Sequence, residues 1–361
     1  MAVPIANEKE YLDAFFKLTL RPAASADLAA WLDSFSEQQR KDFVELADSN
    51  HVVVRAFESV NRLAGNRGMP SLQAWALQVL SSERERIANA LRRLSEVCKA
   101  LEEAGAPVVV MKTLDHWPDL GNDLDLVSTS DHRVILKVLK EAFGATIEPR
   151  SWGDRLACKW NFSLPGLRES IEAHIGRLGQ TGEHTELARG FIARRTRVAV
   201  NGLEFFAPAP EDRIIAATLQ RMYRHFYFRV CDILNAASLV ESGELHFHEL
   251  RAIAANAGIW PGVAGFLKII SDSVRQYRGR ELPLPGFVIK AATVGGDKIY
   301  ARARFLRLPI LPYGARLYAR QLAQTVFRGN MPATLRLSLL PPLASAAAVA
   351  FKITGSDKGV W

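Results

Sequence analysis

Two aspartates at alternate positions are the residues of this sequence whose types and spacing could do chemistry. Asp123 and Asp125 stand in the stretch 120–127, Leu-Gly-Asn-Asp-Leu-Asp-Leu-Val, which is otherwise mostly apolar. Alternation along a β-strand directs both carboxylates to one face of a sheet. Two buried negative charges are costly unless a cation neutralises them, and Mg²⁺ prefers such oxygen ligands. The pattern favours a metal site, and the alternative is an acidic turn at the start of a strand.

A second predicted strand, 170–175, carries an acid and an imidazole in the same alternating pattern. Glu172 and His174 are separated by alanine and flanked by isoleucines, so the polar pair shares one face of the strand. For Glu172 the alternative is a cross-strand ion pair with Lys159 or Arg168. For His174 the alternative is a structural histidine held by a hydrogen bond.

The three acids Asp123, Asp125 and Glu172 predict a two-metal site if their strands are neighbours in one sheet. Three carboxylates can hold two Mg²⁺ ions, with the aspartate pair bridging them. In phosphoryl and nucleotidyl transfer, one ion lowers the pKa of the attacking hydroxyl, and the other neutralises charge on the triphosphate and the leaving pyrophosphate. The combination therefore indicates a transferase that uses a nucleoside triphosphate (NTP).

Periodicity and turn residues predict the elements that must position these acids. Helical periodicity over 7–65 predicts short packed helices, and a much longer helix is expected over 70–105. Serine, threonine and aspartate at 128–131 are expected to cap a helix over 132–143. The segments expected to build the sheet are 107–111, 120–127, 159–164 and 170–175.

The rest of the chain, from residue 211 onward, is predicted to be helical. Its apolar stretch 337–351 contains two prolines and falls short of the roughly 20 residues that span a bilayer, so no transmembrane segment is predicted. We expect a buried helix or an interface there, with peripheral membrane contact as the alternative. The first ten residues lack a basic region followed by an apolar run, so no signal peptide is predicted.

Composition sets broad limits on the class of protein. The chain has 361 residues, of which 48% are hydrophobic and 23% charged, which excludes a disordered chain and allows two or three domains. The formal net charge of +8 suits a nucleotide, a nucleic acid or an anionic membrane, but the basic residues are spread out. Three cysteines without metal-ligand spacing fit a reduced cytoplasm.

The motifs resemble the nucleotidyltransferase fold shared by DNA polymerase beta, and within it a bacterial family of uncharacterised nucleotidyltransferases. Members of that family have a strand ending in Leu-Lys-Gly, an Asp-x-Asp strand followed by a helix, and a later strand with an acid and a histidine. The corresponding stretches here are 111–113, 123–127 and 171–174. The Pro-Glu-Asp at 210–212, with a histidine and Arg-x-x-Asp further on, is similar to another part of the family pattern.

This resemblance implies an α+β fold, a small mixed-sheet nucleotidyltransferase palm flanked by helical regions. The implied regions are an N-terminal helical region 1–84, a catalytic palm 85–206 and a C-terminal helical domain 207–361. The implied catalytic residues, which are also the Mg²⁺ ligands, are Asp123, Asp125 and Glu172. The implied nucleotide-binding residues are Lys112, Thr113, His174 and Arg229.

Some of these positions have a structural alternative or depart from the family pattern. Lys112 is either a phosphate contact or a solvated lysine at a strand end, and Arg229 is either a nucleotide contact or the ion-pair partner of Asp232. We expect His225, Arg229 and Asp232 to lie along one helix face because of their spacing. Lys112 and Thr113 stand where the family usually has glycine, whose backbone can approach a triphosphate closely.

The sequence thus predicts a cytoplasmic, Mg²⁺-dependent nucleotidyltransferase. It would bind an NTP such as ATP and transfer the nucleoside monophosphate to an unknown acceptor, either a small molecule or a protein. A catalytically degenerate binding protein is the alternative, membrane-associated and linked to surface polysaccharide or peptide biosynthesis. An RNA-modifying transferase is a third hypothesis, but no RNA-binding segment is recognisable.

Overall fold

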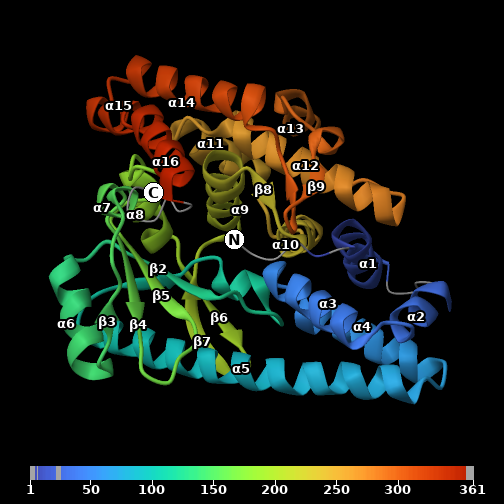
Figure 1. Cartoon of the computed structure of the whole chain (residues 1–361). Helices are drawn as coiled ribbons and strands as arrows, with labels where there is room; N and C mark the ends of the chain where they lie inside the picture. The colour runs from blue at the N-terminus through green and yellow to red at the C-terminus, as the bar shows by residue number, and fades with distance from the viewer. Residues whose placement is uncertain (1–4, 6, 22–25, 355–361) are drawn as a thin grey trace.

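The computed structural model describes residues 5, 7–21 and 26–354. Part of the N-terminal stretch for which no signal peptide is predicted, residues 1–4 and 6, lies outside the described residues, as does the end of the predicted C-terminal domain, 355–361. A small sheet lies between a long helix on one side and a layer of C-terminal helices on the other (Figure 1). The helices that precede the sheet are α1 (Glu8–Leu20), α2 (Ala26–Asp33), α3 (Glu37–Ser49), α4 (Val53–Asn66) and α5 (Pro70–Glu103).

The sheet is mixed, as predicted. Its strands are β1 (Val108–Val110), β2 (Asp123–Ser128), β3 (Thr146–Ile147), β4 (Lys159–Ser163) and β5 (Ser170–Ile175), in the spatial order β1-β2-β5-β4-β3. Only β2 and β5 pair in parallel, and the other neighbours are antiparallel. The two strands predicted to carry the acids are therefore adjacent at the centre of the sheet.

Short helices and a hairpin surround the sheet. The helix α6 (His132–Phe143) begins at the predicted cap, where the Asp131 side chain accepts a hydrogen bond from the Arg133 backbone N–H at 2.9 Å. It ends at Gly144, whose φ of 62° is favourable for glycine. The other elements here are η1 (Thr113–His116), α7 (Trp152–Leu156), α8 (Thr185–Ala193), β6 (Thr196–Val200) and β7 (Leu203–Ala207).

The C-terminal part is mainly helical but contains a small sheet that the sequence pattern did not predict. Strands β8 (Tyr227–Phe228), β10 (Phe305–Arg307) and β9 (Tyr300–Arg302) form it, in that order. The helices are α9 (Pro210–Thr218), η2 (Leu219–His225), α10 (Val230–Glu241), α11 (Phe247–Asn256), α12 (Trp260–Arg278), α13 (Gly286–Ala291), η3 (Gly296–Lys298), η4 (Ile310–Gly314), α14 (Ala315–Phe327), α15 (Met331–Ser338) and α16 (Leu340–Thr354).

One continuous hydrophobic core joins the three predicted regions. Helix α5 starts at Pro70, a favourable first helical residue, and buries a periodic apolar face that includes Leu80, Leu91 and Leu94. It runs beneath both the N-terminal helices and the sheet (Figure 1). The buried apolar residues form a single cluster that extends into the C-terminal helices as far as Leu317. The sheet that carries the acids is therefore held from both sides.

Of the two expectations for 337–351, the buried helix is wrong, because most of the described part of this stretch is exposed, and the interface stays a prediction. Within the described residues, the helical segment Met331–Ala350 is the one long and apolar enough to cross a membrane, and 17% of its most apolar window is buried. The length argument against a membrane span therefore does not hold for this longer segment. The segment is not one continuous helix, since the chain turns at Leu339 between α15 and α16.

Candidate active site

Strand β2 places the two aspartates on one side of the sheet, as its alternation predicts. Leu124 and Leu126 are fully buried on the opposite face, whereas Asp123 and Asp125 line a cavity of about 180 Å³. Asp125 is buried and Asp123 is exposed to solvent. The first prediction about the acids, that both face the same side, therefore agrees with the structure.

Strand β5 brings Glu172 beside this pair. In the parallel register of β2 and β5, Asp125 lies opposite Glu172, and Glu172 lines the same cavity. Ligand atoms of Asp125, Glu172 and His174 lie within 4.8 Å of one another. The His174 Nε2 atom is 2.8 Å from Glu172 Oε1 and 3.6 Å from Asp125 Oδ1. The carboxylate cluster, defined as Asp123, Asp125 and Glu172, therefore has the histidine at its inner end.

The pKa values of the carboxyl groups in this cluster are shifted by their neighbours. Although Asp123 reaches solvent, the surrounding cavity walls partly desolvate it, and this burial, followed by the charges of Asp125 and Glu172, raises the pKa of Asp123 to about 6. Burial also opposes ionisation of Glu172, but the hydrogen bond from His174 and the charge of Lys159 hold the pKa of Glu172 well below its usual range. The neighbouring cations therefore do not fully neutralise the negative charge that surrounds Asp123. A bound cation would relieve this imbalance.

Two lysines already contact the carboxylate cluster. The Lys112 Nζ atom is 2.8 Å from Asp125 Oδ1, and the Lys159 Nζ atom is 2.6 Å from Glu172 Oε2. The predicted alternative for Glu172, an ion pair with Lys159 across the strands, is therefore present. Both lysines also line the cavity, so each has its ammonium group beside the acids and within reach of a ligand.

The turn after β1 fixes the aspartate strand. Lys112 has a φ of 62°, and the Thr113 backbone N–H donates to the Met111 carbonyl at 2.6 Å, which closes a γ-turn. Thr113 is buried, and its hydroxyl accepts the Asp125 backbone N–H at 2.8 Å. Lys112 thus adopts the positive φ that glycine reaches most easily. In this structure, Thr113 holds Asp125 in place rather than facing the cavity.

The wall opposite the sheet comes from the end of η2, from β8 and from the start of α10. The prediction that His225, Arg229 and Asp232 share one helix face is wrong. The helix leaves its regular form at Leu219, and Phe226 has a φ of 53°, after which β8 pairs with β10. His225 and Arg229 nevertheless line the cavity, together with Arg224, which the motif analysis did not select as a site residue.

The predicted alternative for Arg229, an ion pair with Asp232, is also wrong. The Asp232 carboxylate accepts the backbone N–H of Arg229 at 2.6 Å and pairs with the Nε atom of Arg221 at 2.7 Å. Arg221 is fully buried, so it is the better placed partner. The Nε of Arg229 is buried and has no hydrogen-bond partner among the described residues. Its guanidinium is therefore suited to an anionic ligand in the cavity.

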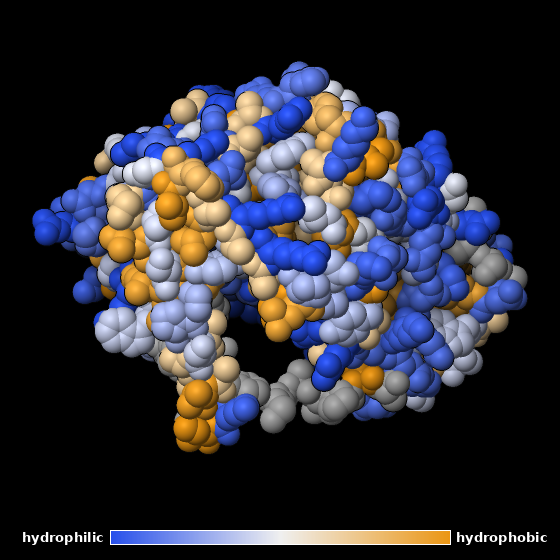
Figure 2. Space-filling view, turned by 90° about the horizontal axis from the view of Figure 1, so that it is seen from above, coloured by the Kyte–Doolittle hydropathy of each residue, from blue (hydrophilic) through white to orange (hydrophobic). Residues whose placement is uncertain are grey.

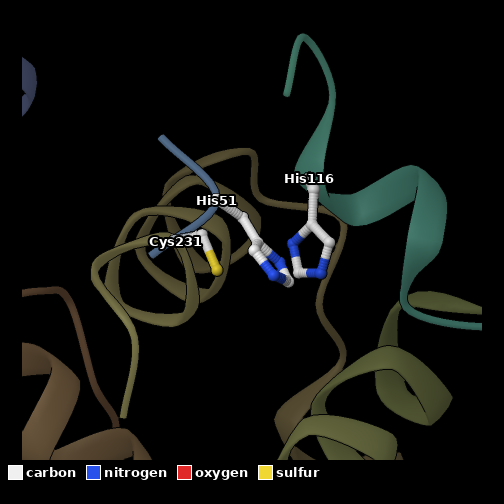
Figure 3. A group of neighbouring side chains, drawn as sticks. All are labelled: His51, His116 and Cys231. Carbon is white, nitrogen blue, oxygen red and sulfur yellow. The ribbon is translucent and has the colours of Figure 1, made fainter. Parts of the chain in front are cut away.

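A second group of possible metal ligands lies on this side of the cavity. His51, His116 and Cys231 come from the α3–α4 loop, η1 and α10, and their ligand atoms lie within 4.8 Å of one another (Figure 3). We call these three residues the histidine–cysteine cluster. A Cβ atom on Gly121 would lie 2.8 Å from the His51 ring, so only glycine leaves room for it. The wide sequence separation of the three residues explains why no spacing motif indicated them.

The charges around the histidine–cysteine cluster oppose a cation. Burial, followed by the charge of Arg229, lowers the pKa of both His51 and His116 well below the usual range, so both rings are neutral. Burial raises the pKa of the Cys231 thiol, which therefore keeps its proton. His116 is held by a contact of 2.9 Å between its Nδ1 and the Asn235 side chain. Although its donors are of the type that binds Zn²⁺, we assign this cluster to packing of the cavity wall.

The small mixed sheet, with acids on two parallel strands facing a wall of cationic side chains, defines a nucleotidyltransferase-like α+β protein. The chain belongs to the uncharacterised nucleotidyltransferase family, whose model matches residues 36–271. This match confirms the resemblance inferred from the motifs. It covers the N-terminal helices from Ser36 onward, the whole sheet and α9 to α12 in large part.

Comparisons with other proteins add little detail about activity. No curated protein matches the chain. Among solved structures, the chain is similar to an antigenic nucleotidyltransferase-like protein from Paracoccidioides brasiliensis, with 18% sequence identity and a TM-score of 0.32. The similarity covers 47% of this chain and 87% of that one. The function must therefore be argued from the site itself.

Proposed function

We propose that the protein is a Mg²⁺-dependent nucleotidyltransferase that transfers the nucleoside monophosphate of an NTP to an acceptor hydroxyl. The observation that carries this proposal is the parallel pairing of β2 with β5, which sets Asp125 opposite Glu172 with Asp123 at the cavity mouth. Hard oxygen donors of this kind suit Mg²⁺. A cytoplasmic location, where NTPs are available, is part of the proposal.

The cavity supplies the two kinds of group that this reaction needs. Asp123, Asp125 and Glu172 would hold the metal, which when bound would polarise the phosphate and lower the pKa of the hydroxyl. On the opposite wall, Arg224 and Arg229 face the space in which a triphosphate would lie. With about 180 Å³, the cavity is smaller than the roughly 300–1,000 Å³ of ordinary small-molecule sites. It fits the metal and phosphates, and the nucleoside would extend beyond it.

In the proposed reaction, the acceptor oxygen attacks the α-phosphorus in line with the leaving pyrophosphate. A bond forms between the acceptor oxygen and the α-phosphorus, and the bond from that phosphorus to the bridging oxygen of the β-phosphate breaks. Glu172, held ionised by His174 and Lys159, is a weak base and serves as a metal ligand, so the hydroxyl proton is released to water at the open side of the cavity. Lys112, Arg224 and Arg229 bind the phosphate oxygens and stabilise the negative charge that develops on the leaving pyrophosphate.

A binding protein without catalytic activity is a second candidate, and the lysines favour it. Lys112 and Lys159 occupy positions against Asp125 and Glu172 that a metal would otherwise take. If these lysines are permanent counterions, a nucleotide would bind the cationic wall without any metal. The two candidates therefore differ in whether Mg²⁺ is needed for nucleotide binding.

The test combines substrate, metal and variants. Full-length protein is incubated with each α-labelled NTP, with Mg²⁺ or with EDTA, and pyrophosphate release and label transfer are measured. Asp125→Asn removes a charge at nearly constant size, and Asp297→Asn is the control because Asp297 lies on the surface in η3. We expect Mg²⁺-dependent release in the wild type and in Asp297→Asn, and none in Asp125→Asn.

Two results would contradict the enzyme proposal. Equal pyrophosphate release by the wild type and Asp125→Asn would show that the carboxylate cluster is not catalytic. Tight NTP binding in EDTA, with no release under any condition, would favour the binding protein. Calorimetric titration of the wild type with NTP, with and without Mg²⁺, separates these cases.

A further inference from the structure

A larger apolar cavity lies beside the candidate active site. It has a volume of about 620 Å³ and lies between η2, η4 and the helices α14, α15 and α16. This size is within the range of about 300–1,000 Å³ that holds small molecules. The apolar side chains that line most of it include Phe226, Ile310, Tyr318, Leu337, Leu340 and Ala347.

The two cavities share a boundary. Arg224 and His225, at the end of η2, line both the carboxylate cavity and the apolar cavity. A ligand that fills the apolar cavity therefore has one end next to the groups that face the triphosphate. Gln180, another polar lining residue, lies at the same end and donates to the Arg224 carbonyl at 3.3 Å, whereas Gln321 and Glu183 contact each other at 3.5 Å. The cavity thus offers an apolar body and a polar end.

The outer surface of the same helices is apolar as well. Figure 2 shows hydrophobic residues gathered at the left of the view, over the C-terminal helices, with a hollow beside them. Phe327 and Ile353 are 90% and 77% exposed, and Met331, Leu335 and Val349 are also exposed. An exposed apolar patch of neighbouring residues typically marks an interaction site. This patch continues the apolar lining of the cavity along α15 and α16.

Basic residues accompany the apolar surface. Arg316 and Arg320 on α14 and Lys352 on α16 are exposed, and Lys352 lines the cavity. A helical surface with apolar side chains and basic residues suits an amphiphile or a membrane interface. A nucleoside is a poorer occupant, because most of the exposed lining is apolar and the Gln321 and Glu183 side chains already contact each other.

Resting on the proposed function, we infer that the acceptor is an amphiphile. Its aliphatic body would lie in the apolar cavity, and its hydroxyl would pass Arg224 and His225 to reach the α-phosphorus. The bonds formed and broken are those of the proposed reaction, with pyrophosphate leaving and the hydroxyl proton released to water. The shared chemistry is an alkyl chain ending in a hydroxyl-bearing head, whether the molecule is free or embedded in a membrane.

The test compares acceptors that differ only in their apolar body. Octyl β-glucoside is paired with methyl β-glucoside, and 1-octanol with ethanol, each below its aggregation limit, with Mg²⁺ and α-labelled NTP. We expect label transfer to the octyl compounds with a kcat/KM at least about 100-fold higher, since several methylene groups leave water. A parallel reaction with octyl glucoside in phosphatidylglycerol vesicles tells whether a membrane-embedded acceptor is preferred to a free one.

Two alanines of α16 provide matched variants. Ala344 lines the cavity and Ala346 does not, although both are exposed on the same helix. Ala344→Phe should fill the cavity and reduce the kcat/KM for octyl acceptors about 10-fold or more, an effect on the scale of excluding a few methylene groups. Ala346→Phe should leave it unchanged. Neither variant should alter pyrophosphate release to water, because neither residue lies in the carboxylate cavity.

The outcomes separate this inference from the proposed function. Equal use of methyl and octyl acceptors, or equal behaviour of the two alanine variants, would overturn the amphiphile inference. The inference would also be overturned if Ala344→Phe raised the KM for NTP without changing the kinetics for octyl acceptors, because the nucleoside would then occupy the apolar cavity. If pyrophosphate release to water continues while no octyl compound is labelled, only the acceptor inference fails. If no pyrophosphate is released with any acceptor, the proposed function fails and the inference with it.

Discussion

Two groups of possible metal ligands lie beside one cavity, and they differ in charge rather than in geometry. Ligand atoms of Asp125, Glu172 and His174 converge within 4.8 Å, and the same holds for the histidine–cysteine cluster. Distance alone would assign a metal to both. The carboxylate cluster, however, has surplus negative charge, whereas the histidine–cysteine cluster is neutral and lies near Arg229.

The surroundings of each cluster explain the difference. The strand register of β2 and β5 forces like charges together, and the pKa of Asp123 rises to about 6 because burial and two neighbouring acids oppose its ionisation. At His51 and His116, burial and an arginine disfavour any added positive charge. The comparison teaches that a cation site is defined by unbalanced charge as much as by converging donors.

The largest effect is expected from removing charge at the centre of the carboxylate cluster. Asp125→Asn should reduce Mg²⁺-dependent transfer by about 1,000-fold, since it removes a metal ligand and leaves Lys112 without its ion-pair partner. Steady-state kinetics over a range of Mg²⁺ concentrations measure this loss. If Asp125→Asn kept the wild-type rate of transfer, the metal would have to bind elsewhere, and the contrast between the two clusters would be wrong.

A smaller effect is expected at the residue that positions Asp125. Thr113→Val keeps the shape but loses the hydroxyl that accepts the Asp125 backbone N–H, so transfer should fall about 10-fold, the equivalent of one lost hydrogen bond. Thr146→Val, at the exposed edge of the same sheet, is the matched control. The loss should appear in kcat rather than in the KM for NTP. An effect on KM alone would indicate direct contact with the nucleotide instead.

The pH dependence of stability tests the charge surplus directly. Because the pKa of Asp123 is about 6 in the folded protein and about 3.9 in an unfolded chain, the native state binds the extra proton between these values. Stability without metal should therefore fall as pH rises from 4 to 7, by about 1 kcal/mol once solvent screening of this exposed side chain is allowed for. Urea unfolding of Asp123→Asn should lack this fall. If the stability of Asp123→Asn had the same pH dependence as that of the wild type, the surplus of negative charge at Asp123 would be contradicted.

The smallest effect on transfer is expected in the histidine–cysteine cluster. Cys231→Ala should change the Mg²⁺ concentration that gives half-maximal transfer by less than about twofold. It should lower the free energy of unfolding by about 1–2 kcal/mol, as expected for a small cavity in a packed interior. Metal analysis of the wild type should find no bound Zn²⁺. Stoichiometric Zn²⁺ that disappears in Cys231→Ala would overturn our assignment of this cluster to packing.

The sequence predicted the part of the site that local patterns encode. Alternation placed Asp123 and Asp125 on one face, and the cap at Asp131 located α6, because both depend on neighbours within a few residues. The pairing of Glu172 with Asp125 needed the order of strands, which the family resemblance implied. The structure then showed which lysines balance the acids.

The missed features depend on contacts between distant segments. The irregular η2 and the turn at Phe226 arise because Tyr227 and Phe228 pair with β10, nearly 80 residues further along the chain. The histidine–cysteine cluster joins three separate segments, and Asp232 takes Arg221 as its partner rather than the nearer Arg229. Helical spacing alone could not predict these choices, since tertiary packing decides them.

The ion pair between Lys112 and Asp125 has a consequence for how ligands bind. One carboxylate oxygen cannot serve both the ammonium group and a metal at full strength, so a cation that takes Asp125 frees Lys112 to bind phosphate. Binding of the metal and of the triphosphate would then be thermodynamically linked. By reciprocity, each ligand would raise the equilibrium affinity for the other by the same factor, and neither would bind well alone.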